Sequence, residues 1–225
     1  MIVPRRDYWS IHPSSVYQAL ETSENGLSEQ EAQRRLRTYG YNELPRPGFS
    51  GVRVLFRQFR NPMFVILLAC AIVAGFFAEL KQSIMILSMI ALSVVLGFYN
   101  EYKAEKIVVD LRRNVSIKAV VTRDGKPSEI GSQLLVPGDV VSVYVGDIVP
   151  SDMRVVHSKD LQVNEAVLTG ESFPVEKTSN LLDIEGQPTP QQLTNYLFMG
   201  TVVVHGDGRG VVVSTGKNTE FGAIS

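Results

Sequence analysis

Two long apolar runs stand close together in the first half of the chain, Met63 to Ala78 and Ser83 to Tyr99. Neither run contains a charged residue, and both are apolar around the whole circumference of a helix. Each comes at or slightly below the roughly 17–25 residues that cross a bilayer, and flanking residues can supply the remaining length. The alternative is a helical hairpin buried in a soluble core, but such a hairpin would keep a polar stripe. The pattern therefore favours two membrane-spanning helices.

The connection between the two runs is only the stretch Glu79–Gln82, which predicts an antiparallel hairpin. Basic residues flank the hairpin on its open side, whereas the tip carries only Lys81: Arg53, Arg57, Arg60, Lys103, Lys106, Arg112 and Arg113. By the positive-inside rule, both termini are expected to be cytoplasmic. The second span is then expected to continue as a helical stalk over Asn100–Asn114.

Short stretches of helical periodicity precede the spans. The segment His12–Ser23 predicts one short helix with Ser14 as its N-cap. A second helix follows, because Ser28 and Glu31 have the spacing of a capping box and Gly40 suits a C-terminal stop.

The stretch Val52–Arg60 has apolar residues on one helical face and arginines on the other. This pattern is typical of an interfacial helix that lies on an anionic membrane surface. A core-facing helix of a soluble protein would show the same pattern, but the position directly before a span favours the membrane surface.

From Ser116 onward the apolar periodicity changes to two, with β-branched runs separated by Gly and Pro. Asp124-Gly125 predicts a hairpin turn, and we interpret His205–Gly208 as another hairpin connection. Regularly spaced short strands indicate a compact all-β sandwich, barrel or jelly roll. The predicted fold class is thus a membrane α+β protein, divided at 1–50, 51–62, 63–100 and 101–225.

Composition excludes several function classes. The 225 residues carry a formal net charge of −1, so no basic footprint for nucleic acid is present. Cys70 is the single cysteine and the three histidines are scattered, which predicts no metal site. The stretch Gly210–Asn218 resembles a phosphate loop only superficially, because five residues separate its glycines and Asn218 follows the lysine.

The candidate catalytic residues are the tetrad Thr169, Gly170, Glu171 and Ser172. On composition alone, this is a turn that exposes an acid, as on many protein surfaces. The spans contain no ionisable side chain in their apolar stretches, so the hairpin is not expected to coordinate a transported cation by itself.

The neighbours of the tetrad change this interpretation. Leu134–Val141 (LLVPGDVV) is followed by Val145–Val156 (VGDIVPSDMRVV), then by Leu161–Lys177 around TGES, and then by Phe198–Gly222. This succession resembles the actuator domain of P-type cation-transporting ATPases, a distorted jelly roll whose signature is the TGES loop. The segment before the spans resembles the cation-ATPase N-terminus. The sequences of the motifs are similar to those of the magnesium-importing and calcium-type bacterial branches. Two departures are Ser151, where the family often has Ala, and Asn164-Glu165, where it often has Asp-Gln.

The resemblance implies a role for each residue of the tetrad. In the family, ATP phosphorylates an aspartate on a separate domain, and the TGES loop docks on the aspartyl phosphate. Glu171 would orient and activate the hydrolytic water, Gly170 would let the backbone approach the phosphate, and Thr169 and Ser172 would hold the loop.

The sequence contains no DKTG motif and no nucleotide-binding domain, so we expect it to be inactive alone. ATP and magnesium are implied only for the complete pump, with no cofactor in this chain. The expected partners are the lipid bilayer and the remaining domains and helices of the pump, and the expected location is the plasma membrane. A standalone regulatory or binding module without catalysis remains an alternative, whereas a membrane anchor with an unrelated β domain does not fit the succession of motifs.

Overall fold

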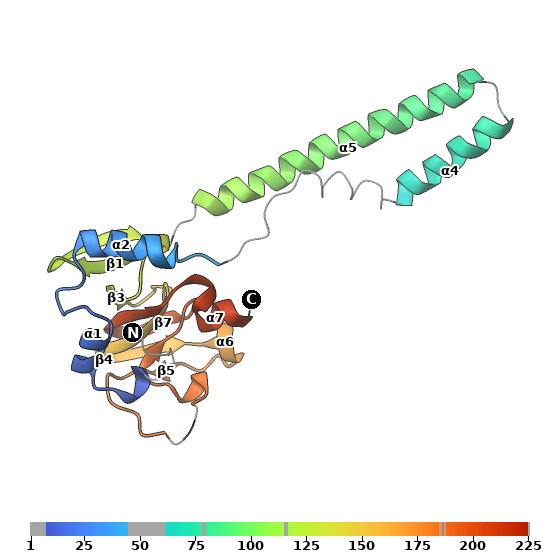
Figure 1. The fold of residues 1–225 in the computed structure, drawn as a ribbon. Coiled ribbons are helices and arrows are strands. Elements are labelled where there is room, and N and C mark those ends of the chain that lie inside the picture. Colours follow the sequence, from blue (N-terminus) through green and yellow to red (C-terminus); the bar gives the residue numbers. More distant parts are fainter. Residues whose placement is uncertain are drawn as a thin grey trace. The chain divides into compact units, whose positions relative to one another are not determined.

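The computed structural model describes residues 8–44, 62–77, 80–114, 117–184, 186 and 188–224. The chain forms two compact units, which we describe separately (Figure 1). One unit joins Met1–Pro45 to Ser116–Ser225, and the other is Arg46–Val115. The N-terminal segment therefore folds with the β domain, although the apolar runs separate the two in sequence. The predicted domain boundaries themselves stay a prediction.

The second unit contains two helices that contact each other, α4 (Pro62–Phe77) and α5 (Leu80–Asn114). Within the described residues, the stretch Ile84–Ile107 of α5 is long and apolar enough to cross a membrane. The helix continues without a break through the predicted stalk. The spanning hairpin as a whole stays a prediction, and the predicted interfacial helix Val52–Arg60 lies outside the described residues.

The N-terminal segment contains a 3-10 turn, η1 (Tyr8–Ser10), and the helices α1 (Pro13–Ala19) and α2 (Glu29–Tyr39). The prediction of Ser14 as the first N-cap is wrong, because His12 caps α1 and its Nδ1 accepts the Ser14 N–H at 3.4 Å. Pro13 then occupies the first turn, where a missing N–H costs nothing.

The predicted start and stop of α2 are confirmed. The Oγ of Ser28 accepts the Glu31 N–H at 3.2 Å, and Gly40 ends the helix with a φ of 79°. Only the Ser28 half of the predicted capping box is present among the described residues, because the Glu31 carboxylate binds Arg34 and Arg35 instead.

The rest of the first unit is built on a seven-stranded antiparallel sheet. The strand order is β2-β1-β3-β7-β4-β5, with β6 also paired to β4. The strands are β1 (Lys118–Arg123), β2 (Lys126–Gly131), β3 (Val140–Tyr144), β4 (Asp152–Asn164), β5 (Val175–Glu176), β6 (Tyr196–Leu197) and β7 (Val202–Ser214). Short helical turns complete the unit: η2 (Ser132–Leu134), α6 (Ala166–Thr169), η3 (Pro190–Gln192), η4 (Gly216–Asn218) and α7 (Glu220–Ile224). The distorted jelly roll stays a prediction.

One predicted hairpin is confirmed and the other is wrong. Asp124 and Gly125 join β1 to β2 with φ values of 48° and 72°, as a two-residue hairpin turn requires. By contrast, β7 runs without interruption through His205–Gly208 and pairs with β4, whose register shifts several times. A Cβ on Gly206 would lie 2.2 Å from the backbone oxygen of Lys159, so this glycine permits a close approach of two bulged strands.

The described part of the unit contains three apolar clusters. The smallest comprises Leu27, Ala32 and Val136, and the two larger ones hold most of the unit together. One lies among the strands and includes Val121, Val155 and Val212. The other joins the N-terminal segment to the sheet, because it combines Val16 and Leu20 with residues of the strands, including Val140, Tyr196, Val211 and Val213. Burial of apolar area thus makes α1 an integral part of the β unit.

Candidate functional site

The tetrad Thr169–Ser172, which we call the signature loop, lies in an excursion from the edge of the sheet. The chain leaves β4 after Asn164, makes the single turn α6, and returns as β5 (Figure 1). Val175 pairs with Val163 and Glu176 with Gln162, so both ends of the excursion are fixed by the same strand. Because β5 ends the strand order, the sheet displays the signature loop at its edge.

Gly170 ends α6 in the left-handed conformation, with φ 76° and ψ −4°. Its N–H donates to the oxygen of Ala166 at 2.9 Å. Apart from Gly170 itself and its two chain neighbours, no atom lies within 4 Å of the place where a Cβ would be, so the backbone conformation alone favours glycine here. The open space also leaves the backbone of the loop accessible to a ligand.

The hydroxyl of Thr169 fixes the backbone of the signature loop. It donates to the oxygen of Glu165 at 3.1 Å and accepts the N–H of Glu171 at 3.1 Å. The side chains beyond it, of Glu171, Ser172 and Phe173, are exposed. Within the described part of the chain, the Glu171 carboxylate has no hydrogen-bond or ion-pair partner. The backbone of Glu171 is therefore held, while its carboxylate is exposed and unengaged by any described residue.

A buried ion pair lies at the base of the excursion. Oε1 of Glu165 is 2.6 Å from Nζ of Lys177, and both residues are 1% exposed. Burial raises the pKa of Glu165 and lowers the pKa of Lys177, and the charge of each partner opposes the shift of the other. The sequence reasoning missed this pair. The one available signal was the departure at Asn164-Glu165, where Asn164 also accepts the Ala166 N–H at 2.9 Å.

The aspartates of the other motifs serve the fold. Asp139 of the PGD motif is fully buried, accepts the Val136 N–H at 2.9 Å and pairs with Arg123 at 2.8 Å. Asp152 of the VPSD motif accepts the N–H groups of Met199 and Glu220. Carboxylates whose oxygens are engaged with buried backbone donors are typical of structural positions.

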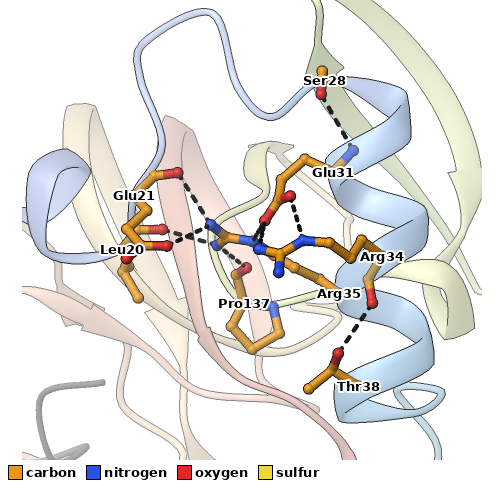
Figure 2. A network of polar contacts seen from close by, with 8 residues as sticks. All are labelled: Leu20, Glu21, Ser28, Glu31, Arg34, Arg35, Thr38 and Pro137. Carbon is orange, nitrogen blue, oxygen red and sulfur yellow. Dashed lines mark hydrogen bonds and ion pairs between the residues drawn. The ribbon is translucent and has the colours of Figure 1, made fainter. Parts of the chain in front are cut away.

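Arg35 joins the N-terminal segment to the PGD turn, as Figure 2 shows. Its guanidinium donates to the backbone oxygens of Leu20, Pro137 and Glu21 at 2.8, 2.9 and 3.1 Å. A Cβ on Gly138 would lie 2.3 Å from the guanidinium, so the glycine makes room for it.

Two further buried polar side chains extend this attachment. Asn42 donates to the oxygens of Ser132 and Pro150 and accepts the Gly216 N–H. Arg154 is fully buried, and its hydrogen bonds to described residues all go to backbone oxygens, including that of Tyr8 at 3.0 Å. Burial lowers the pKa of Arg154 to about 10. We call the contacts of Arg35, Asn42 and Arg154 the docking surface.

A cavity of about 500 Å³ lies between the N-terminal helices and β7. Its lining includes Tyr8, Arg34, Tyr39 and Lys217, and none of the residues of the signature loop. Among the described residues, no group of three or more His, Cys, Asp or Glu could hold a metal ion.

Comparison with known proteins places this geometry in a family. Residues 113–225 match the model of the P-type ATPase actuator domain, and residues 8–74 match that of the cation transporter/ATPase N-terminus. The calcium-transporting ATPase of Bacillus subtilis is 36% identical over 214 residues, which cover 94% of this chain and 24% of that protein.

Relatives from other organisms show similar agreement. The sodium/potassium exporting P-type ATPase cta3 of Schizosaccharomyces pombe is 39% identical over 203 residues, covering 89% of this chain and 20% of the relative. The human calcium-transporting ATPase type 2C member 2 is 36% identical over 200 residues, which cover 88% of this chain and 21% of the relative. The chain thus spans between a fifth and a quarter of the length of these curated relatives. It belongs to the P-type ATPase family and comprises the N-terminal and actuator parts of a P-type cation ATPase.

Proposed function

We propose that this chain supplies the actuator and first membrane part of an ATP-driven cation pump, and that its signature loop dephosphorylates an aspartyl phosphate on another domain. The observation that carries the proposal is the exposed carboxylate of Glu171, which engages none of the residues that the structure describes and stands on a backbone fixed by Thr169 and Gly170. Among the other motif aspartates, Asp139 and Asp152 are buried and accept backbone N–H groups, and the exposed Asp147 accepts the Tyr144 N–H at 2.9 Å.

The chemistry requires a positioned water. Hydrolysis of an acyl phosphate proceeds by in-line attack, and a carboxylate within hydrogen-bond reach can orient the water and accept its proton. Glu171 presents such a carboxylate at the edge of the sheet. Gly170 leaves its own backbone uncovered, so that a phosphate can approach the loop closely.

The remaining parts of the reaction belong to partners. The phosphorylated aspartate belongs to a domain outside this chain, and ATP and magnesium bind to domains outside this chain. A lipid bilayer surrounds the hairpin formed by α4 and α5. In this proposal both termini are cytoplasmic and the pump resides in the plasma membrane. The relatives are named for calcium and for sodium and potassium, so their names do not identify the transported ion.

A non-catalytic module is the competing function. The first unit has its own apolar clusters and its own attachment of the N-terminal segment, as a self-contained binding or regulatory module would. The two functions differ in what they require of Glu171, because only hydrolysis needs its carboxylate.

A chimeric pump tests the proposal. Residues 8–225 replace the matching segment of the Bacillus subtilis calcium-transporting ATPase, and the phosphoenzyme formed from labelled ATP is chased with unlabelled ATP. Glu171→Gln keeps the size of the side chain but removes the base, so its phosphoenzyme should decay at least about 100-fold more slowly. The matched control is Glu176→Gln, which alters another exposed carboxylate, on β5, and should leave the decay unchanged.

Two results would count against the proposal. Normal decay of the Glu171→Gln phosphoenzyme in an active chimera would eliminate the catalytic role. Cation-dependent ATP hydrolysis by the purified chain alone would contradict its assignment as one part of a larger machine.

A further inference from the structure

We propose that the buried Glu165–Lys177 ion pair is a positioning device for Glu171, which sets the geometry of the signature loop from inside the core. The proposal rests on the function proposed for Glu171. It assigns roles to two residues that never contact the phosphate or the water themselves.

The pair closes the excursion at its base. Glu165 directly follows β4, and Lys177 directly follows β5, so the residues between them form a loop with both ends tied together. The 2.6 Å contact is shielded from water, because both residues are 1% exposed. A buried pair of this kind interacts far more strongly than a pair on the surface.

The ammonium group of Lys177 is held in one place by further contacts. Its Nζ donates to the backbone oxygen of Leu193 at 3.1 Å and lies 5.4 Å from the centre of the Phe198 ring. The backbone N–H of Lys177 donates to the oxygen of Leu161 on β4 at 2.8 Å. Lys177 is therefore a fixed point of the core, to which the Glu165 side chain is attached.

A short series of contacts leads from this fixed point to Glu171. The backbone oxygen of Glu165 accepts the Thr169 hydroxyl at 3.1 Å and the Thr169 N–H at 3.0 Å. The same hydroxyl accepts the N–H of Glu171 at 3.1 Å. The position of Glu165 thus decides the position of Thr169, which decides where the backbone of Glu171 begins.

The tip of the loop has little else to hold it. Gly170, Glu171, Ser172 and Phe173 are all exposed, and Phe173 retains 85% of its accessible surface. Packing against the core therefore cannot orient the carboxylate. A catalytic group must nevertheless be held close to its productive geometry, which leaves the base of the loop as the source of order.

Hydrogen exchange on the intact chain in detergent micelles tests the positioning without any catalysis. Lys177→Met removes the donor but keeps an apolar side chain of similar length. The amide of Glu171 should then exchange about tenfold faster, while the amide of Val155 in β4 keeps its rate. Glu165→Gln retains an oxygen acceptor for Lys177 and should preserve most of the protection.

A second ion pair, with a buried carboxylate and a half-buried arginine, supplies the control. Arg123 pairs with Asp139 in the same unit and has no contact with the signature loop. Arg123→Met should lower the melting temperature and leave the exchange of Glu171 unchanged. Unchanged exchange at Glu171 in Lys177→Met, or equal acceleration in Arg123→Met, would overturn the proposal.

The chimeric pump then separates positioning from general stability. Lys177→Met should slow the decay of the phosphoenzyme about tenfold and leave its formation unchanged. Added to Glu171→Gln, it should cause no further slowing, because both changes act through one carboxylate. Further slowing of the same size would assign Lys177 a purely structural role. If Glu171→Gln itself decays normally, the hydrolytic function fails, whereas the exchange result stands by itself.

Discussion

The signature loop and the docking surface use charged residues in opposite ways. Arg35 directs its donors to three backbone oxygens and to Glu31, and it is almost fully buried (Figure 2). Glu171 stands on an equally well-defined backbone, yet its carboxylate is exposed and engages none of the described residues. Polar groups with all their partners inside the protein maintain a structure, whereas a free group on a fixed backbone is available for a reaction.

The largest effect on stability should come from Arg35→Met. This change leaves two buried carbonyl oxygens and one partly buried carbonyl oxygen without the arginine donor, which should lower the free energy of unfolding by about 3 kcal/mol. For a unit of this size, the melting temperature should fall by about 10 °C. Thermal unfolding of the chain in detergent micelles, monitored by circular dichroism, measures this fall in melting temperature.

The control for this change is the neighbouring residue. Arg34→Met removes an arginine that is 71% exposed and contacts only the Glu31 carboxylate in the described part of α2. The change should cost less than about 0.5 kcal/mol. Equal losses for the two variants would show that the buried carbonyl contacts do not matter to the docking surface.

Two glycines with positive φ give an intermediate test. Gly138→Ala places a Cβ 2.3 Å from the pinned guanidinium of Arg35 at a φ of 96°, and should cost about 2–3 kcal/mol. Gly170→Ala meets open space at a φ of 76°, and should cost only about 1 kcal/mol for the left-handed backbone. The same melting experiment compares them. A larger loss for Gly170→Ala would mean that the signature loop is packed rather than displayed.

Local signals explain which elements could be predicted from the sequence. The caps of α2 and the Asp124-Gly125 turn depend on residues a few positions apart, so their patterns are visible in a short window. The prediction at His205–Gly208 was wrong because glycine serves both a turn and a close approach of strands. Only the pairing of β7 with β4 distinguishes these cases.

Only part of the candidate site could be predicted from the sequence. The motif directed attention to Thr169–Ser172, and Thr169 does hold the loop, whereas the role of Ser172 stays a prediction. The contact of Arg35 with Pro137 joins residues 102 positions apart in the sequence. The Glu165–Lys177 pair forms because the two ends of the excursion meet where β5 pairs with β4. Periodicity and spacing carry no information on such contacts, because they arise from the three-dimensional packing of the sheet.

The smallest expected effect concerns pH and the Glu31 carboxylate. Hydrogen bonds from Arg34, and then from Arg35, lower the pKa of Glu31 from 4.5 to about 2. Because the folded pKa is depressed, the stabilisation is present above pH 4.5 and is lost as the pH falls towards 2. The melting temperature of the unmodified chain should therefore fall more steeply across this range than that of Glu31→Gln, which cannot titrate.

The difference between those two melting curves isolates Glu31 from the other carboxylates that titrate in acid. Glu176→Gln, a change on β5 far in sequence from α2, should retain the full steepness of the unmodified chain. Because Glu31 is solvent-accessible, the difference should also shrink in high salt, unlike the loss caused by Arg35→Met. Parallel curves for Glu31→Gln and the unmodified chain would remove the Glu31 carboxylate from the partners of Arg35 that stabilise the docking surface. The three backbone oxygens and the exposed Glu21 carboxylate, 3.7 Å from Nη2, would remain. The contrast with Glu171 would then be sharper, since the buried arginine would depend chiefly on the main chain.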